Sequence, residues 1–267
     1  MSQDITFKNV TFRYPIASSS VFENLSLTLS KGVTAFVGQN GTGKTTLLLL
    51  AAGLLLPTEG KVYVQGVDTA DLHEDEQRRQ RYVSFIYQNM EFETEEPIES
   101  LLHFVYEQGF YEQPEPHFID TLIHNFELEH CLAKKTQEIS KGELQRVILA
   151  FSLLYGSRIV IMDEPIFAME GPQKYHAMRF LTDFAKQRGV SLYYAVHELD
   201  ISQRYSDFTV LLKKDDSLLY GRTPKVLTRE RLEEAYEIPL VFLKQKEMLY
   251  RHMLKVKDEE KRKHFLN

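Results

Sequence analysis

An eight-residue stretch, residues 38–45, limits most strongly what this chain can fold into. It reads Gly-Gln-Asn-Gly-Thr-Gly-Lys-Thr, and the spacing glycine, four residues, Gly-Lys-Ser/Thr is typical of a phosphate-binding loop. Residues 32–37 before it predict a buried strand, and the apolar run 46–52 after it predicts a helix. This strand–loop–helix setting separates a phosphate-binding loop from a chance glycine-rich turn.

The residue types of this loop suit the phosphates of a nucleoside triphosphate. Gly38, Gly41 and Gly43 lack a Cβ, so the backbone N–H groups around them can turn toward one anion. The start of the following helix adds the positive end of its dipole. Lys44 can reach the terminal phosphates, and the Thr45 hydroxyl can bind Mg²⁺. The other predicted contacts of the loop are Gln39, Asn40, Thr42 and Thr46.

The order of the predicted elements indicates an α/β fold with a mostly parallel sheet. Strand patterns recur at 82–87, 158–162, 191–196 and 208–213, and helical patterns lie between them at 142–154 and 172–187. Strands that alternate with helices form a parallel sheet covered on both faces. Before the loop, the alternating residues of 4–14 and 25–29 predict an N-terminal antiparallel β subdomain.

The pattern changes after residue 89. Helical periodicity appears at 98–111 and 118–131, and no strand pattern appears between 89 and 140. We expect a helical insert of about residues 89–155 inside a domain of residues 1–225. A charged helical extension, residues 226–267, follows this domain.

Composition excludes several classes of function. The net charge of −6 provides no basic surface for nucleic acid. The single cysteine, Cys131, rules out an internal disulfide and fits a reducing compartment. The longest apolar run, residues 47–56, is too short to span a bilayer. Any role at a membrane therefore requires a partner.

A second candidate site is the apolar run 159–162, which ends in Asp163 and Glu164. Ligands of parallel sheets bind at the carboxyl ends of the strands. There, Asp163 could hold Mg²⁺ and Glu164 could act as general base toward a water facing the γ-phosphate. Alone this motif is weak, because many strands end in an acidic residue. Together with the phosphate-binding loop it predicts a site for nucleotide hydrolysis.

Residues 140–143 form a third motif, with Ser140 and Gly142 at the start of a predicted helix. Ser140 suits the N-cap position, and the open amides of the first turn could receive an anion. By itself, an ordinary capped helix would be the simpler interpretation. The order of the motifs along the chain favours a nucleotide-binding role for this segment over a simple helix cap. From residue 4 to about 225, the chain resembles the nucleotide-binding subunit of ABC (ATP-binding cassette) transporters.

The resemblance implies roles for further residues. Tyr14 stacks on adenine, Gln88 contacts Mg²⁺ and the attacking water, and His197 lies near the γ-phosphate. Each position has a simpler alternative. Tyr14 could belong to the core with Phe12, Gln88 could be a polar strand end, and His197 could be structural. Together with the loop, these residues predict ATP and Mg²⁺ as cofactors.

The resemblance also implies partners. Two copies, or this chain and a related subunit, would pair head to tail around ATP. Each ATP would lie between Lys44 and Thr45 of one copy and Ser140 and Gly142 of the other. Lys141 and Glu143 of the same segment are also predicted nucleotide contacts. The predicted insert would contact a separate transmembrane permease, which places the chain at the cytoplasmic face of the cell membrane. An importer would also have a substrate-binding protein, and no nucleic-acid partner is expected.

The chain departs from the family pattern at two places. Lys141 stands where glycine is usual and Glu143 where glutamine is usual, and the sign of the effect of Glu143 is open. Residues 167–170 read Phe-Ala-Met-Glu where Ser-Ala-Leu-Asp is usual. These changes bear on the rate of hydrolysis rather than on nucleotide binding. A binding module without turnover therefore stays an alternative.

The segment 222–239 is most similar to the tail of importer subunits that serve iron–siderophore, haem, cobalamin or metal uptake. The sequence thus favours an ATP hydrolase that energises such an importer. Two alternatives stay open. One is the ATPase of an ABC exporter, which the identity of the membrane partner would distinguish from an importer ATPase. The other is a non-transport ATPase of the same fold. Acidic charge and a single cassette disfavour nucleic-acid roles for the latter.

Overall fold

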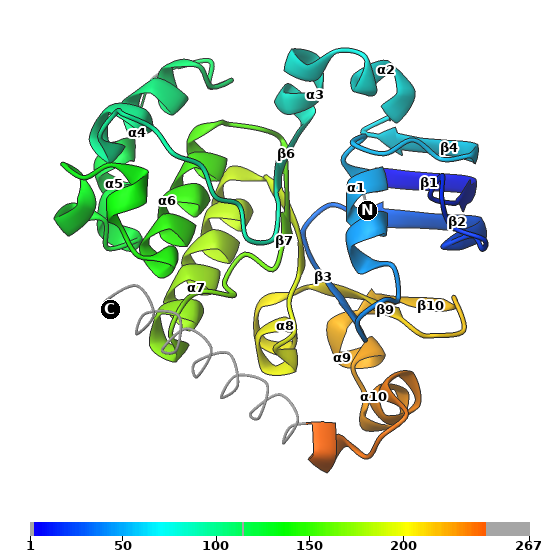
Figure 1. Cartoon of the computed structure of the whole chain (residues 1–267). Coiled ribbons are helices and arrows are strands. Elements are labelled where there is room, and N and C mark those ends of the chain that lie inside the picture. Colours follow the sequence, from blue (N-terminus) through cyan, green and yellow to red (C-terminus); the bar gives the residue numbers. More distant parts are fainter. Residues whose placement is uncertain (1–2, 114, 244–267) are drawn as a thin grey trace.

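The computed structural model describes residues 3–113 and 115–243, which form two sheets with helices around them (Figure 1). The smaller sheet is antiparallel, in the order β2-β1-β4-β5. Its strands are β1 (Gln3–Phe12), β2 (Phe22–Ser30), β4 (Glu59–Val64) and β5 (Val67–Asp68). Ile5 and Phe7 are buried on one face of β1 while Lys8 is exposed. The predicted N-terminal antiparallel subdomain is confirmed.

The larger sheet has the order β10-β9-β3-β8-β7-β6. Its strands are β3 (Val33–Gly38), β6 (Val83–Ile86), β7 (Ile159–Asp163), β8 (Ser191–Ala195), β9 (Phe208–Leu212) and β10 (Leu218–Arg222). All neighbouring pairs are parallel except β10 with β9. Every residue of β3, β7, β8 and β9 is buried, as expected for strands covered on both faces. The mostly parallel sheet is therefore confirmed.

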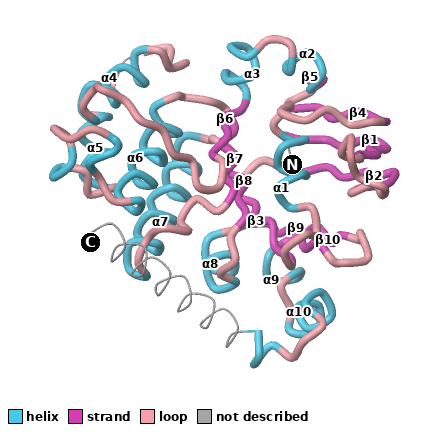
Figure 2. Tube along the Cα trace, viewed as in Figure 1, coloured by secondary structure: helices cyan, strands magenta, loops and turns pink. Residues whose placement is uncertain are grey.

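Helices lie on both sides of this sheet (Figure 2). They are α1 (Lys44–Ala51), α2 (Thr69–His73), α3 (Glu76–Tyr82), α4 (Ile98–Glu107), α5 (Phe118–Asn125), α6 (Lys141–Leu154), α7 (Gly171–Arg188), α8 (Leu199–Tyr205), α9 (Thr223–Val226) and α10 (Arg229–Tyr236). Leu47, Leu48 and Leu50 of α1 share one core with residues of both sheets. The helix that begins at the phosphate-binding loop is thus fixed between the two sheets.

The segment between β6 and β7 is helical, and within its described residues no strand occurs between 89 and 140. Two predicted helices are shorter than expected. The one predicted at 98–111 ends at Glu107, and a Cβ at nearby Gly109 would lie 2.7 Å from the Leu154 carbonyl oxygen. The one predicted at 118–131 ends at Asn125, before Glu127 takes a φ of 52°.

The end of the described chain packs against the parallel sheet. Leu232 and Ala235 of α10 are each 1% exposed and belong to the same core as β7 and β8 residues. The division at residues 225 and 226 stays a prediction, and residues 244–267 of the predicted extension lie outside the described chain. Over residues 3–113 and 115–243, no helix is long and apolar enough to cross a bilayer.

Candidate functional site

The phosphate-binding loop connects the end of β3 to the start of α1, at the carboxyl edge of the parallel sheet. Gly43 caps α1 with a φ of 88°, in the left-handed region. A Cβ at this position would lie 2.8 Å from the ring of Phe22 and 2.9 Å from a methyl of Val21. Glycine is therefore required there both by backbone conformation and by space.

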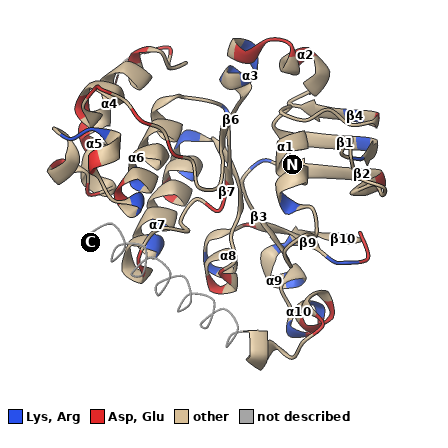
Figure 3. Ribbon diagram, in the orientation of Figure 1, with Lys and Arg blue, Asp and Glu red and all other residues tan. Residues whose placement is uncertain are grey.

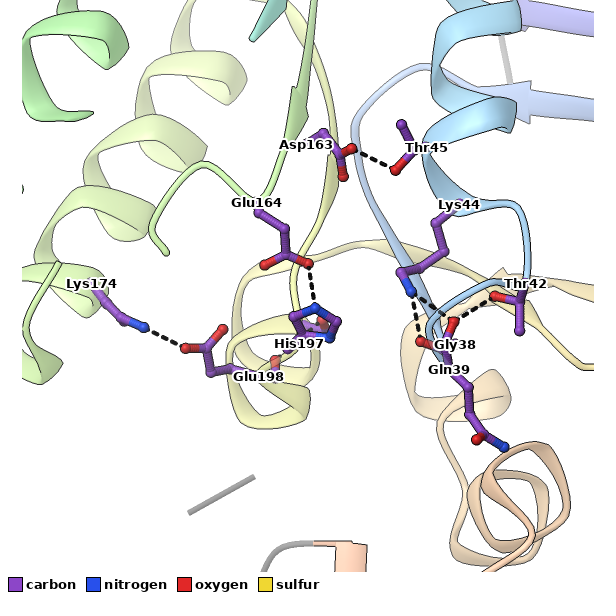
Figure 4. A network of polar contacts seen from close by, with 11 residues as sticks. Gly38, Gln39, Thr42, Lys44, Thr45, Asp163, Glu164, Lys174, His197 and Glu198 are labelled. Atoms are coloured by element: carbon purple, nitrogen blue, oxygen red, sulfur yellow. Dashed lines mark hydrogen bonds and ion pairs between the residues drawn. The ribbon is translucent and has the colours of Figure 1, made fainter. Parts of the chain in front are cut away.

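Lys44 lies across this loop and is only 8% exposed. Its Nζ donates to the carbonyl oxygens of Gly38 at 2.8 Å and Gln39 at 2.9 Å (Figure 4). Burial lowers the pKa of Lys44, and the carboxylates of Glu164 and Asp163 oppose this shift. The ammonium group is thus held by exchangeable backbone contacts next to the loop amides, where it can turn to a phosphate oxygen.

Thr45 and Asp163, the two residues predicted to bind Mg²⁺ at this edge of the sheet, lie in direct contact. The Thr45 hydroxyl donates to Oδ2 of Asp163 at 2.6 Å, between the first turn of α1 and the end of β7. Burial raises the pKa of Asp163, although the hydrogen bond from Thr45 and the charge of Lys44 oppose this. A hydroxyl and one carboxylate suit Mg²⁺, which takes few protein ligands and completes its shell with phosphate oxygens and water.

Glu164 and His197 also come together. Oε1 of Glu164 lies 3.4 Å from Nε2 of His197, and Glu164 N donates to the Ala195 carbonyl at 3.0 Å. Glu164 has a φ of 52°, an uncommon conformation for a residue other than glycine that is often found at functional sites. Burial, aided by the charges of Glu198 and Asp163, raises the pKa of Glu164 to about 8.

His197 follows β8 and is partly buried. Burial lowers the pKa of His197, and the charge of Lys44 lowers it further. A neutral imidazole can both donate and accept a hydrogen bond. The structure therefore combines a carboxyl suited to accept a proton with an imidazole that can orient a neighbouring oxygen.

A buried ion pair behind His197 was not predicted from the sequence. Nζ of Lys174, on α7, lies 2.6 Å from Oε1 of Glu198, and their side chains are 12% and 8% exposed. Glu198 directly follows His197 in the chain, which is the only hint that the sequence offers. The pair ties α7 to the segment that carries His197 (Figure 4).

Residues 140–143 begin α6 as predicted. Ser140 is the N-cap and its Oγ accepts from Glu143 N at 3.3 Å, while Oε2 of Glu143 accepts from Ser140 N at 2.6 Å. This is a capping box. A Cβ at Gly142 would lie 3.0 Å from the Ala168 carbonyl oxygen, so this position leaves little room for a side chain. Nζ of Lys141 lies 2.6 Å from Oε1 of Glu91 and forms an ion pair with it.

The glutamate at 143 has a partner that the sequence did not reveal. Nε2 of His130 lies 2.6 Å from Oε1 of Glu143. Burial by itself would raise the pKa of Glu143. The hydrogen bonds with Ser140 and His130 outweigh this effect and lower the pKa to about 2. The carboxylate that replaces the usual glutamine is thus bound by its own chain and caps its own helix.

The low pKa of Glu143 predicts a pH dependence of stability. The folded value of about 2 lies below the ordinary 4.5. The contribution of Glu143 to the free energy of unfolding is therefore fully present above pH 4.5 and is lost as the pH falls toward 2. In urea denaturation across this interval, we expect a steeper loss of stability in the wild type than in Glu143→Gln. Glu129→Gln, a neighbouring exposed carboxyl, is the control. Equal slopes for wild type and Glu143→Gln would contradict the assignment.

Tyr14 and Gln88 lie at the margins of this site. The Tyr14 hydroxyl is 3.0 Å from Oγ1 of Thr46, its ring meets Phe12 edge-on, and the side chain is 37% exposed. Gln88 is exposed in the turn after β6. Ser140 begins α6, which lies on the opposite side of β7 from α1 in Figure 1. The fold therefore assembles the loop, the acidic pair and His197, whereas Ser140 caps a helix on the other side of β7.

Comparison with known proteins agrees with this geometry. Residues 22–167 match the family described as ABC transporter. The chain is 31% identical to a putative ABC transporter ATP-binding protein of Archaeoglobus fulgidus, over 85% of this chain and 93% of the relative. It is 25% identical to the petrobactin import ATP-binding protein YclP of Bacillus subtilis, over 88% and 94% of the two chains.

Solved structures share the fold. A dimeric ATP-binding cassette in a post-hydrolysis state, bound to ADP and phosphate, superposes with a TM-score of 0.70 and 22% identity, over 82% of this chain and 98% of the other. The matched profile, the relatives and the order of the motifs agree with one another. This chain therefore belongs to the ABC transporter family, in which it is an ATP-binding subunit with an ATP hydrolase domain.

Proposed function

We propose that this chain powers a membrane importer, and that two copies act together with each ATP held between them. The observation that carries this proposal is the division of the site. Lys44, Thr45 and Asp163 form one set at the edge of the sheet, whereas Ser140 begins a helix on the other side of β7. Ser140 of a second copy, turned head to tail, can complete the site that the first copy leaves open.

The residues of one copy would divide the work at the nucleotide. Lys44 would exchange the carbonyls of Gly38 and Gln39 for phosphate oxygens. Thr45 and Asp163 would hold Mg²⁺, which neutralises charge on the phosphates when bound. Glu164 would accept a proton from water, and His197, 3.4 Å away, would keep that carboxyl and the water in line.

A groove beside Gln88 provides a surface for the permease. It has a volume of about 380 Å³ and lies between β6 and the helical segment. Its apolar lining includes Phe85, Phe92, Val105 and Phe151. Two further lining residues, Tyr87 and Met90, flank Gln88 and are 44% and 41% exposed. A helix of the permease that fills this groove would contact the same segment that carries Gln88.

Met90→Asp tests the groove. A charge in an apolar docking surface costs affinity, so we expect permease binding to weaken by at least about tenfold. The fall should appear as lost permease-stimulated ATP turnover in a reconstituted complex. Val241→Asp alters a more exposed apolar residue, 61% accessible, outside the residues that line the groove, and serves as the control for an added surface charge. If both variants keep the permease-stimulated ATP turnover of the wild type, the groove is not the docking surface.

Import of an iron complex, cobalamin, haem or metal is the favoured direction and cargo class. The similarity of 222–239 to importer tails supports this, as does the relative named for petrobactin import. The test is uptake of radiolabelled iron–siderophore, haem, cobalamin and metal ions by cells whose native copy is replaced by Glu164→Gln. Loss of uptake for one cargo supports import. Normal uptake of all of them, with accumulation of an exported compound, would favour the exporter.

A further inference from the structure

One hydrogen bond joins the phosphate-binding loop to helix α10. Nε2 of Gln39 donates to the carbonyl oxygen of Ala235 at 3.0 Å. In Figure 4 the side chain of Gln39 points away from Lys44 and toward the helix coloured as α10. Ala235 lies in the last turn of α10, where carbonyl groups have no partner within the helix. The Gln39 amide therefore satisfies a backbone acceptor that belongs to the far end of the chain.

The same residue also contacts Lys44, the predicted phosphate-binding lysine. The backbone carbonyl of Gln39 accepts from Nζ of Lys44 and from the Thr42 hydroxyl, each at 2.9 Å. One residue is thus bonded to Lys44 through its main chain and to α10 through its side chain. A shift of α10 would therefore move the Gln39 carbonyl oxygen that accepts the hydrogen bond from Lys44.

Helix α10 is anchored firmly enough to serve as a support. Its residues Leu232 and Ala235 are each 1% exposed. Glu234 of α10 pairs with Lys213 at 2.7 Å, and Lys213 directly follows β9. β9 is the strand that pairs with β3 up to the start of the loop. Charges of both signs lie along α10 (Figure 3), so its attachment near the loop combines apolar packing with ion pairs.

We propose that α10 is a positioning element of the ATP site, and that ATP occupancy and the docking of α10 are coupled through the Gln39 side chain. The proposal rests on the proposed function only in that the loop binds ATP. A loop fixed in advance loses less conformational freedom when ATP binds. Coupling between two sites is reciprocal, so ATP must stabilise the docked α10 by the same factor by which α10 strengthens ATP binding.

The test approaches the contact from both sides. Gln39→Leu keeps the size of the side chain and removes the donor, and we expect ATP affinity to fall about three- to tenfold, the effect of one hydrogen bond. Ala235→Leu crowds the buried face of α10 and should weaken ATP binding although α10 makes no nucleotide contact. In the Gln39→Leu background, Ala235→Leu should have no further effect on ATP affinity, because contacts in one network are not additive.

Amide hydrogen exchange of residues 229–236 provides the second measurement. In the wild type we expect Mg-ATP to slow this exchange, and in Gln39→Leu we expect no such response. Lys214→Met removes the ion pair with Glu237 and should speed exchange while the response to Mg-ATP remains. Independent effects of Gln39→Leu and Ala235→Leu, or a normal response in Gln39→Leu, would overturn the coupling. A wild type that fails to bind ATP would instead overturn the proposed function.

Discussion

Replacing Glu164 with glutamine should reduce ATP turnover by about 10²- to 10⁴-fold, the usual contribution of a general base. Glutamine keeps the shape of the side chain but cannot accept the proton. ATP affinity should stay close to that of the wild type, because Lys44 and Thr45 are untouched. Turnover is measured as phosphate release with the purified chain and again with its permease.

The fold of this variant should survive. Glu164 is only 4% exposed, and glutamine has nearly the same shape and volume, so the buried position should accept it without repacking. Glu74→Gln, an exposed carboxyl after α2, controls for loss of an acidic residue elsewhere. Glu164→Gln turnover at the wild-type rate, with the fold intact, would remove Glu164 from the reaction.

Replacing Lys44 with methionine should cost about 2–5 kcal/mol of ATP binding free energy, the usual effect of removing one partner of a buried charge pair. Methionine fills the space of the lysine stem but offers no donor to the phosphates. Titration with a fluorescent ATP analogue measures the change in affinity, and the thermal unfolding midpoint verifies that the variant is folded.

Lys31→Met provides the matched comparison for Lys44→Met. Lys31 is exposed before β3, whereas Lys44 is buried at the start of α1, after the loop that follows β3. The same chemical change is thus made at an exposed and at a buried lysine. Equal nucleotide affinity in the two variants would mean that Lys44 does not contact the phosphates.

Most of the fold could be predicted from the sequence because its strands are strongly patterned. β3 and β7 are continuous apolar runs, and α1 follows the loop directly. β10 was not predicted, since its first four residues are half-buried and its last is exposed. Its position depends on pairing with β9, a contact between segments that local pattern does not encode.

The candidate site divides in the same way. The residues of the loop are contiguous in sequence and so are the two acidic residues, and the two motifs together indicated their chemistry. The contacts of Glu143 with His130, of Lys174 with Glu198 and of Gln39 with Ala235 join separate elements. From the sequence alone, each polar side chain in these contacts could have been an ordinary exposed residue. Only the tertiary structure shows its partner.

The structure shows what the Glu143 carboxylate contacts within one copy. In the structure both of its oxygens are engaged, by Ser140 N at 2.6 Å and by His130 at 2.6 Å. The departure from the family pattern at 143 therefore serves the helix cap of the chain itself, and its negative charge is directed to a histidine.

Sedimentation velocity of Glu164→Gln with Mg-ATP tests the central claim most directly. Slow hydrolysis should trap the pair, because the ATP that joins the two copies persists. We expect the mass of two chains with Mg-ATP and the mass of one chain with Mg-ADP, and Ser140→Arg in the same background should abolish the pair. A Glu164→Gln chain that binds Mg-ATP fully and still sediments as a single copy would contradict the shared site.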